Sequence, residues 1–383
     1  MANSNLTSAK RTKNDEFYTQ YRDIEKEISA YLEFNPDVLR DKTLLLPCDD
    51  PEWSNFTKFF AQNFGAFGLK KLISTSYAAD SKTNGAGYQP TLFESESEKF
   101  DREKTNVRGK IFTLTRDMTQ DGKIDVNDLD WEYLAGDGDF RSDEVRKLRD
   151  ESDIVITNPP FSLFREFLAW LVEAEKQFLI IGNMNAITYK EVFPLIKQNK
   201  LWLGNGFHAG NAYFSVSSDR EYASGVYDET TGLVKFRNCC WFTNIDHARR
   251  YQPLPLMTME DNLKYSKHKE LKGKQAYERY ENYDAIEVSF TDAIPSDYSG
   301  VMGVPISFLD KYSPEQFEIL GMCENEDLYN MKTKVYTTPE CKKAYLNKFD
   351  KKGVYDLNAS GVVIRDGLLE KVYQRILIKH KQS

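Results

Sequence analysis

The stretch SDIVITNPPFSLFREFLAW (residues 152–170) constrains the fold of this chain more than any other part of its sequence. Ile154, Val155 and Ile156 form a short β-branched run, which is typical of a strand buried on both faces of a parallel sheet. Two prolines end the run, because proline lacks an N–H and disfavours helical geometry in the residue before it. Six apolar residues then recur at helical spacing: Phe161, Phe164, Phe167, Leu168, Leu171 and Val172. The stretch therefore predicts a buried strand, a rigid turn and an amphipathic helix.

The segments around this stretch alternate between helix and strand patterns. Apolar spacing predicts helices over 15–32 and 53–68, and short apolar runs predict strands within 42–50, 69–77 and 177–187. Such alternation is typical of an α/β fold with a parallel sheet.

The interruptions of this alternation predict the domain organisation. Residues 1–13 are expected to form a flexible polar arm, and residues 14–200 to form the core. Residues 79–138, rich in Gly, Ser and acidic side chains, are expected to be an insertion around a hairpin at GKIFTLTRD (109–117). Residues 201–383 are expected to complete the core sheet and to add a further region, with a late helix over DGLLEKVYQRILIKH (366–380).

Composition excludes several classes of protein. A chain of 383 residues can bury a large core, and no window reaches the ~18 consecutive apolar residues of a membrane helix. The first residues, MANSNLTSAKRTKNDEFY, lack the apolar core of a secretion signal, so we expect a cytoplasmic protein. The five cysteines form no C-x-x-C pair and there are only four histidines, so we expect neither a disulfide framework nor a metal centre.

The net charge of -8 counts mildly against a nucleic-acid partner, because phosphates attract clustered Lys and Arg. The acidity lies in the first 246 residues, which carry 30 basic and 39 acidic side chains, whereas residues 247–383 carry 21 and 20. A local basic face in the last third is therefore compatible with the sequence. Its candidates are Arg249, Arg250, the run 264–274, and the pairs Lys342/Lys343 and Lys351/Lys352. A solvated surface is the alternative for each.

The turn NPPF (158–161) has groups that suit a planar amine. It lies at the carboxyl end of a predicted parallel strand, where ligands bind in open α/β sheets. If Asn158 Oδ1 and the Pro159 carbonyl accept the two hydrogens of adenine's exocyclic amine, the nitrogen gains tetrahedral character, and its lone pair can point at an activated methyl group. Stacking on Phe161 would hold the base with ~1–3 kcal/mol. Because an adenine inside a duplex is out of reach, the base would have to be flipped out.

A purely structural interpretation of NPPF is the alternative. The turn then only ends the strand, and Phe161 packs the following helix into the core. The buried strand before the turn and the amphipathic helix after it favour methyl transfer to adenine N6.

Five blocks of the sequence resemble one family of enzymes. They are DEFYTQ (15–20), CDDPEWSNF (48–56), NPPF (158–161), WFTN (241–244) and GVPISFLDKYSPEQFEILG (303–321). In these blocks the chain resembles the EcoRI-type adenine-specific DNA methyltransferases. The resemblance implies a Rossmann-like fold with a mixed, mostly parallel sheet that binds S-adenosylmethionine. It places catalysis at Asn158, Pro159, Pro160 and Phe161.

The resemblance also implies a set of cofactor contacts. Two segments would line the methionine end of the cofactor: Asp15, Glu16, Phe17, Tyr18 and Thr19, and Pro47, Cys48, Asp49, Asp50 and Pro51. Asp139 would hydrogen-bond the cofactor's amine and Phe140 would pack on its ring, although a helix N-cap is the alternative for Asp139. The chain departs from the usual pattern in two places. It lacks loop glycines after LLLPCDD, and the acidic residue expected after the second strand is not evident in LISTSYAAD.

The order of the motifs implies that target recognition lies after Asn158, within residues 201–383. Double-stranded DNA is the expected partner, and a companion restriction endonuclease is a candidate functional partner. Trp202, Trp241 and the phenylalanines around them are candidate base wedges, with core packing as the alternative for the two tryptophans. Two other functions stay open: N-methyl transfer to RNA or to a protein amide, and cofactor or nucleic-acid binding without catalysis.

Overall fold

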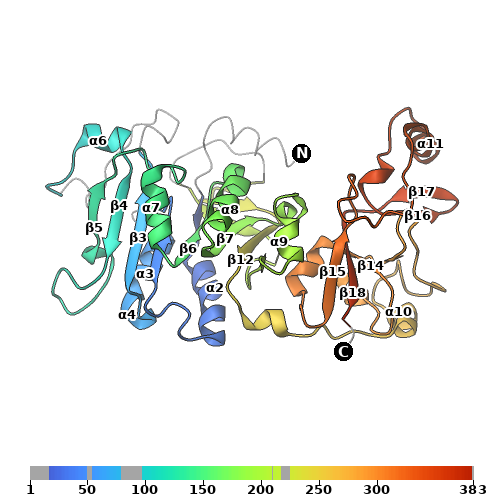
Figure 1. Ribbon diagram of the computed structural model, residues 1–383, viewed down its shortest axis with the longest axis horizontal. Coiled ribbons are helices and arrows are strands. Elements are labelled where there is room, and N and C mark those ends of the chain that lie inside the picture. The colour runs from blue at the N-terminus through green and yellow to red at the C-terminus, as the bar shows by residue number, and fades with distance from the viewer. Residues whose placement is uncertain (1–16, 50–53, 79–96, 209, 217–224, 382–383) are drawn as a thin grey trace. The chain divides into compact units, whose positions relative to one another are not determined.

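The structure is a computed structural model, and it describes residues 17–49, 54–78, 97–208, 210–216 and 225–381. The chain forms two compact units (Figure 1). The first comprises Met1–Ile196 and Lys200–Ala248, and the second comprises Lys197–Asn199 and Arg249–Ser383. None of the described helices combines the length and apolar character needed to cross a bilayer.

An eight-stranded sheet, in the order β5-β4-β3-β2-β6-β7-β12-β8, forms the centre of the first unit. Its strands are β2 (Thr43–Leu46), β3 (Lys71–Ser76), β4 (Lys110–Leu114), β5 (Asp130–Tyr133), β6 (Ile154–Thr157), β7 (Gln177–Asn183), β8 (Trp202–Leu203) and β12 (Cys239–Thr243). The four strands β3, β2, β6 and β7 are parallel, whereas every other neighbouring pair is antiparallel. The predicted mixed α/β sheet is confirmed: its four central strands pair in parallel, and among its eight described strands only β4 and β12 run against the others.

Helices and a small second sheet complete the first unit. The helices are α2 (Tyr21–Phe34), α3 (Asn55–Gln62), α4 (Phe64–Phe67), α6 (Arg102–Val107), α7 (Asp143–Glu151), α8 (Phe164–Glu173) and α9 (Phe193–Lys197), with 3-10 turns η2 (Val126–Asp128), η3 (Phe161–Leu163) and η4 (Met184–Thr188). A further 3-10 turn, η5 (Ala248–Tyr251), begins at the last residue of this unit and continues in the second unit. The small sheet, in the order β1-β9-β11-β10, contains β1 (Tyr18–Thr19), β9 (Ala212–Ser215), β10 (Tyr227–Asp228) and β11 (Leu233–Phe236).

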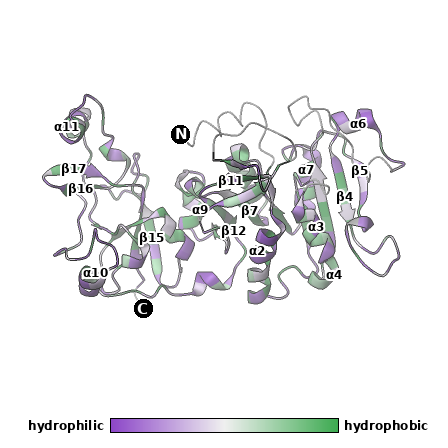
Figure 2. Cartoon of the chain, turned by 180° about the vertical axis from the view of Figure 1, so that it is seen from behind, coloured by the Kyte–Doolittle hydropathy of each residue, from purple (hydrophilic) through white to green (hydrophobic). Residues whose placement is uncertain are grey.

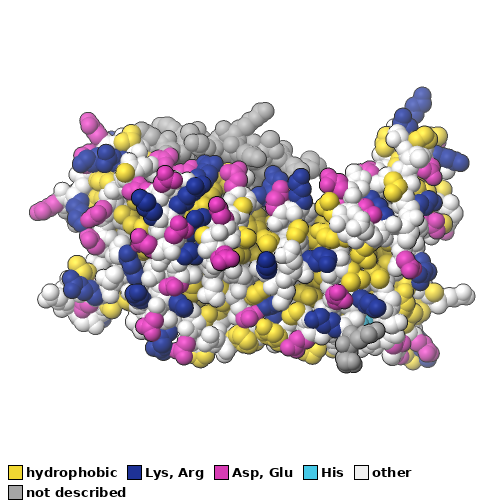
Figure 3. Space-filling model, in the orientation of Figure 1, with side chains coloured by type: hydrophobic (Ala, Val, Ile, Leu, Met, Phe, Trp, Pro, Cys, Tyr) yellow, Lys and Arg dark blue, Asp and Glu magenta, His cyan; other side chains and the backbone are white. Residues whose placement is uncertain are grey.

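The strand and helix predicted over residues 152–170 are confirmed. Ile154, Val155 and Ile156 are at most 1% exposed, and Val155 pairs with Leu45 on one side and Phe178 on the other. The strand is therefore buried on both faces, as its β-branched run predicts. Figure 2 shows hydrophobic colour on the central strands, and Figure 3 shows charged side chains of both signs interspersed on the surface.

The order of the parallel strands reverses between β2 and β6. The chain passes from β2 through α3 to β3 in one direction along the sheet, and from β6 through α8 to β7 in the other. Because such crossovers are right-handed, α3 and α8 lie on opposite faces of the sheet. The loops at the carboxyl ends of β2 and β6 diverge at such a reversal, which is where α/β sheets bind their ligands.

Two predictions for the first unit need correction. The helix predicted over 15–32 begins only at Tyr21, because Tyr18 and Thr19 pair with β9 as a short strand. The described part of the predicted insertion, 79–138, contributes β4 and β5, which extend the large sheet beside β3. The hairpin therefore joins these two strands through a long loop instead of folding within residues 109–117.

The second unit contains a four-stranded sheet in the order β13-β14-β18-β15 and a two-stranded hairpin, β16-β17. Its elements are α10 (Met259–Tyr265), β13 (Ile286–Glu287), η6 (Thr291–Ala293), β14 (Met302–Pro305), η7 (Ile306–Lys311), β15 (Phe317–Met322), α11 (Thr338–Phe349), η8 (Leu357–Ala359), β16 (Val362–Arg365), β17 (Leu368–Lys371) and β18 (Arg375–His380). The helix predicted over 366–380 is wrong. Asp366 and Gly367, with φ of 50° and 75°, form the two-residue turn that joins β16 to β17. The residues after β17 form β18, which lies between β14 and β15.

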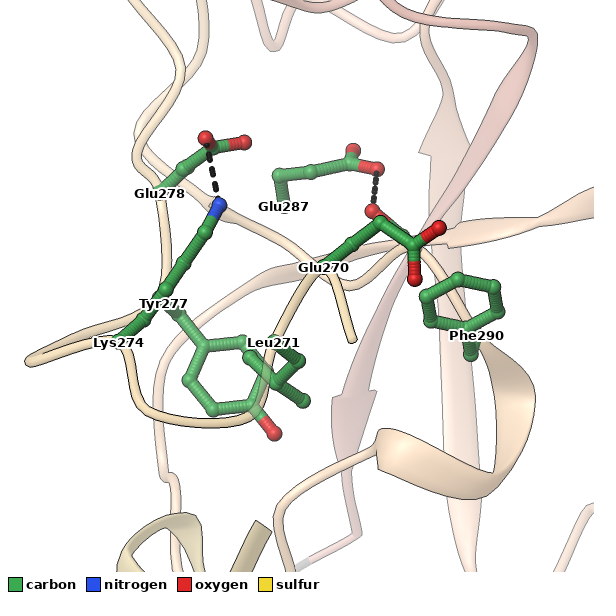
Figure 4. Close-up of a pocket in the computed structure, with 8 residues that line it drawn as sticks. Glu270, Leu271, Lys274, Tyr277, Glu278, Glu287 and Phe290 are labelled. Carbon is green, nitrogen blue, oxygen red and sulfur yellow. Dashed lines mark hydrogen bonds and ion pairs between the residues drawn. The ribbon is translucent and has the colours of Figure 1, made fainter. Parts of the chain in front are cut away.

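A buried ion pair joins the strands of the second unit. Glu287 and Arg375 are 4% and 7% exposed, and Arg375 donates from Nη2 at 2.6 Å and from Nε at 3.1 Å to the Glu287 carboxylate. Ser289 Oγ (2.9 Å) and the Tyr280 hydroxyl also donate to that carboxylate. Glu287 lines a small pocket where Lys274 Nζ lies 3.0 Å from Glu278 Oε1 (Figure 4). The carboxylate is thus fully engaged within the fold.

Candidate active site

The side-chain amide of Asn158, directly after β6, has a fixed orientation. Its Nδ2 donates to the carbonyl oxygen of Phe17 at 2.6 Å, across 141 residues of sequence. Since a carbonyl can only accept, the amide oxygen Oδ1 must point away from Phe17. Oδ1 is buried and has no hydrogen-bond partner among the described residues. A buried acceptor left unsatisfied costs about 1–3 kcal/mol, so Asn158 is held ready for a donor that a ligand supplies.

The rest of the turn leads into the helix and presents an aromatic ring. The Pro160 carbonyl accepts from Leu163 N at 2.9 Å, which begins η3. The ring of Phe161 is half-buried, and its centroid lies 6.1 Å from Phe17, 6.1 Å from Phe214 and 5.4 Å from Phe236. We call these four residues the phenylalanine cluster. Phe161 thus packs against other apolar residues, as the structural interpretation of NPPF predicts. Its ring is nevertheless only half-buried.

The loop after β2 lies beside the end of β6. Thr157 Oγ1 donates to the Pro47 carbonyl at 2.8 Å, which joins the two strand ends. Cys48 has a φ of 66°, so a cysteine takes the left-handed conformation that glycine more often supplies. Asp49 is only 4% exposed, and Ser54 Oγ, at the N-cap of α3, donates to its Oδ1 at 2.8 Å. A carboxylate is favourable there because the helix N-terminus carries partial positive charge.

The segment Phe17–Thr19 connects the catalytic turn to this loop. The Phe17 carbonyl holds Asn158, and the Thr19 carbonyl accepts from Asn55 Nδ2, at the start of α3, at 2.8 Å. Tyr18 and Thr19 pair with Ser215 and Phe214 of β9. Thr19 Oγ1 is a second buried oxygen that has no hydrogen-bond partner within the described ranges. Asp15, Glu16, Asp50 and Pro51, which the resemblance also implicates, lie outside the described residues.

The loop that carries Asp139 packs on the carboxyl end of β3. Ala78 N donates to the Asp137 carbonyl at 2.8 Å, and Gly138 has a φ of 88°. Asp139 pairs with Arg141, whose Nη2 and Nε lie 2.6 Å and 2.9 Å from the carboxylate. This loop therefore lies at the same edge of the sheet as the loops after β2 and β6.

The alternative role of Asp139 as a helix N-cap is wrong. The N-cap of α7 is Ser142, whose Oγ accepts from Val145 N at 3.3 Å. Phe140 has no exposed surface, and its ring packs against Phe167 and Trp170 with centroids 5.0 Å and 5.6 Å away. The side chain of Phe140 therefore supports this loop from the core.

Tyr77, which the sequence analysis missed, lies between two of the predicted cofactor segments. Burial raises the pKa of its hydroxyl well above the usual range, and the neighbouring Cys48 and Asp139 groups raise it further. Tyr77 follows β3, where the sequence pattern predicted only the end of a strand. The contact shows that the loops after β2, β3 and β5 meet at one place.

Gly138→Ala is expected to disrupt the contact between the loops after β2, β3 and β5. A Cβ at Gly138 would lie 2.3 Å from the Ser76 carbonyl oxygen, and a positive φ alone costs an alanine roughly 1–2 kcal/mol. We expect a lower free energy of unfolding and weaker cofactor binding, measured by urea denaturation and calorimetry. Gly136→Ala is the matched control, because its nearest neighbour would be Glu144 Oε2 at 3.9 Å. Equal behaviour of the two variants would contradict the tight approach of this loop.

The two tryptophans proposed as base wedges differ in burial. Trp241 is fully buried and stacks on Phe207 at 5.6 Å, so core packing is confirmed for it. Trp202 is half-buried and donates from Nε1 to the Ile245 carbonyl at 3.0 Å. Phe214 and Phe236, in contrast, reach Phe161 from the small sheet, and no sequence motif indicated them.

The chain matches the family model described as adenine-specific methyltransferase EcoRI over residues 5–381. The chain belongs to this family. It is 43% identical over 328 residues to the type II methyltransferase M.EcoRI of Escherichia coli, covering 85% of this chain and 91% of that protein. It is 34% identical over 335 residues to the type II methyltransferase M.MpnI of Mycoplasma pneumoniae, covering 86% and 89%. No solved structure shows a significant similarity.

Membership of the EcoRI family confirms the enzyme class that the five sequence blocks implied. The protein is an adenine-specific methyltransferase, and S-adenosylmethionine is its methyl donor. A third relative, the type II methyltransferase M.MgeORF184P of Mycoplasma genitalium, is 32% identical over 326 residues, covering 83% of this chain and 86% of the relative. The alternatives of RNA or protein-amide methylation and of binding without catalysis receive no support.

Proposed function

We propose that this protein methylates N6 of a specific adenine in double-stranded DNA after flipping the base out of the duplex. The buried, unpartnered Oδ1 of Asn158 supports the proposal most directly. An amine hydrogen would supply the donor that this oxygen lacks. Asn158 lies at the reversal of strand order, which is where a Rossmann-like fold holds its cofactor.

The residues of the turn prepare the amine for reaction. Asn158 Oδ1 and the Pro159 carbonyl accept its two hydrogens, so its lone pair turns out of the plane of the base. Bound S-adenosylmethionine supplies a methyl group activated by its sulfonium. Asn158 Oδ1 and the Pro159 carbonyl would hold the amine while its lone pair takes up this methyl group from the sulfonium, and the methylated amine would then lose one proton to solvent. Asn158 acts by orientation and needs no change of protonation.

We assign the cofactor to the loops that meet beside Asn158. Their polar groups suit its charged methionine end: Thr19 Oγ1 is a buried oxygen open to a donor, and Asp49 is fixed at the N-terminus of α3. Asp139, at the third loop, would accept from the cofactor's amine. The direct contacts are proposed to come from Phe17, Tyr18, Thr19, Pro47, Cys48, Asp49 and Asp139, with Asp15 and Asp50 added on the family resemblance. Phe140 is buried and is proposed to support the loop without touching the ligand.

The second unit is proposed to hold target recognition. Because the substrate is cellular DNA, we place the enzyme in the cytoplasm and propose a companion restriction endonuclease as its functional partner. The decisive test is transfer of label from radiolabelled S-adenosylmethionine to DNA, in competition with RNA and a protein extract. Label in adenine of DNA alone is expected, and label in RNA or protein alone would overturn the assignment. Sequencing of methylated adenines in expressing cells gives the target site.

Phe161→Leu tests the stacking of the base. The variant keeps apolar bulk in the phenylalanine cluster but loses the flat ring, whose stacking is worth ~1–3 kcal/mol. We therefore expect kcat/KM for DNA to fall between about fivefold and 150-fold. Phe161→Tyr is expected to retain activity. The fluorescence of 2-aminopurine at the target position should show less flipped base with the leucine variant, and unchanged flipping and kinetics would contradict a stacking role.

A further inference from the structure

Four of the basic candidates in the second unit are engaged within the protein. Arg249 Nη2 lies 2.6 Å from Asp310, and the buried Arg250 donates to Asn199 at 2.5 Å. Within the run 264–274, Lys267 pairs with Asp292 at 2.6 Å and Lys274 with Glu278 at 3.0 Å. These groups therefore offer little free positive charge to a partner.

Helix α11 and the loop after it differ from these clusters. Residues 332–352 contain seven lysines and only two acidic residues, in a chain whose net charge is -8. Four of these lysines, Lys342, Lys343, Lys351 and Lys352, are exposed and form no ion pair within the described part of the chain. We call these four the lysine face. Figure 3 shows Lys and Arg side chains, with hydrophobic ones among them, over the region that Figure 1 labels α11.

The local fold keeps this face outward. A capping box, in which the Thr337 N–H donates to Glu340 at 2.7 Å, starts α11. Cys341 and Ala344 are buried in a small apolar cluster with Leu357, so Lys342 and Lys343 lie on the opposite side of the helix. The helix is thus anchored by one side and presents its cations from the other.

Isolated apolar side chains accompany the lysine face. Leu346 and Phe349 are 49% and 42% exposed on α11, and Val354, in the following loop, is 55% exposed. The apolar stripe of α11 is already packed on its own unit, so the outward side has no continuous apolar surface for insertion into lipid. Cations mixed with single apolar contacts suit the phosphates and groove edges of a nucleic acid.

We propose that the lysine face, with the outward side of α11, is a contact surface for the phosphate backbone of double-stranded DNA. The proposal rests on the proposed function, and it adds which part of the second unit receives the duplex. Charge complementarity carries it: each phosphate neutralised by a lysine releases a condensed counterion, which favours binding at low salt.

The test is the salt dependence of duplex binding by the full chain. In Lys342→Gln/Lys343→Gln, the slope of log K against log salt concentration is expected to become shallower by about 0.9 for each lost phosphate contact, and KM for DNA to rise. The rate at saturating DNA should stay unchanged, because the catalytic turn and the cofactor loops belong to the first unit, whereas these lysines belong to the second. Both lysines are exposed, and thermal unfolding verifies that the variant folds.

Lys269→Gln/Lys272→Gln is the matched control, because both of its lysines are exposed and the change in net charge is the same. The same loss in both double variants would overturn the proposal, since it would report net charge alone. Retained DNA affinity with lost binding to phosphatidylserine vesicles would also overturn it and indicate a membrane surface. If the unmodified protein methylates no DNA, the proposed function itself fails. If it does, and the lysine variant matches wild type, only this inference fails.

Discussion

Asn158→Ala is expected to lower the rate of methyl transfer by about 10³-fold, because it removes an oriented acceptor from the reacting amine. Cofactor affinity should change little, since the amide faces Phe17 and the target base. Single-turnover transfer and isothermal calorimetry measure the two quantities. Asn127→Ala, at an exposed position of η2 in the same unit, is the control.

Asn158→Asp separates the two roles of the amide, which are to accept from the target amine and to donate to the Phe17 carbonyl. An aspartate keeps an acceptor oxygen for the amine but replaces the Nδ2 donor that holds the Phe17 carbonyl at 2.6 Å. Two oxygens then face each other, so we expect an activity between those of wild type and the alanine variant. An alanine variant as active as the wild type would remove Asn158 from the mechanism.

Arg375→Met is expected to destabilise the second unit by about 3–5 kcal/mol. The substitution leaves the Glu287 carboxylate, 1% exposed in its side chain, without its counter-ion. The loss can be measured as faster native-state hydrogen exchange of the β18 amides. Because the ion pair lies in the second unit, the exchange of β6 in the first unit is the internal reference.

The double variant Glu287→Gln/Arg375→Met should recover much of this stability, because the buried charge is then gone while Ser289 and Tyr280 keep an acceptor. Arg279→Met is the surface control. Arg279 pairs with Asp284 at 2.6 Å, but both side chains are more than half exposed, so we expect an effect of at most ~1 kcal/mol. A single Arg375 variant as mild as this control would show that the pair contributes no more than a surface contact.

The catalytic strand was predictable because its signals are local. The β-branched run, the two prolines and the helical spacing after Phe161 all agree, and a buried parallel strand leaves few other patterns. The residues 366–380 gave conflicting signals. Leu368, Leu369 and Val372 fit a helix, but Asp366 and Gly367 are a typical hairpin pair, and Ile376, Leu377 and Ile378 are fully buried because β18 is an inner strand.

The candidate site was predictable only in part, because much of it depends on contacts between distant segments. The two prolines of NPPF predict the turn from the local sequence, and the family resemblance indicated Pro47–Asp49 and Asp139. Neither indicates that Phe17 holds the Asn158 amide, that Tyr77 meets Cys48, or that Phe214 and Phe236 reach Phe161 from another sheet. Such contacts are set by packing of the whole unit, which no local pattern encodes.

The attachment of the first strand to β9 affects when the enzyme becomes active during its synthesis. Gln20 Nε2 donates to Ser215 Oγ across 195 residues, and Phe17, whose carbonyl holds Asn158, lies directly before β1. A ribosome releases the first strand long before β9 exists, and contacts so distant in sequence form late in folding. A nascent chain therefore lacks the held Asn158 amide until β9 has been made, and translation products truncated before β9 should show no methyl transfer.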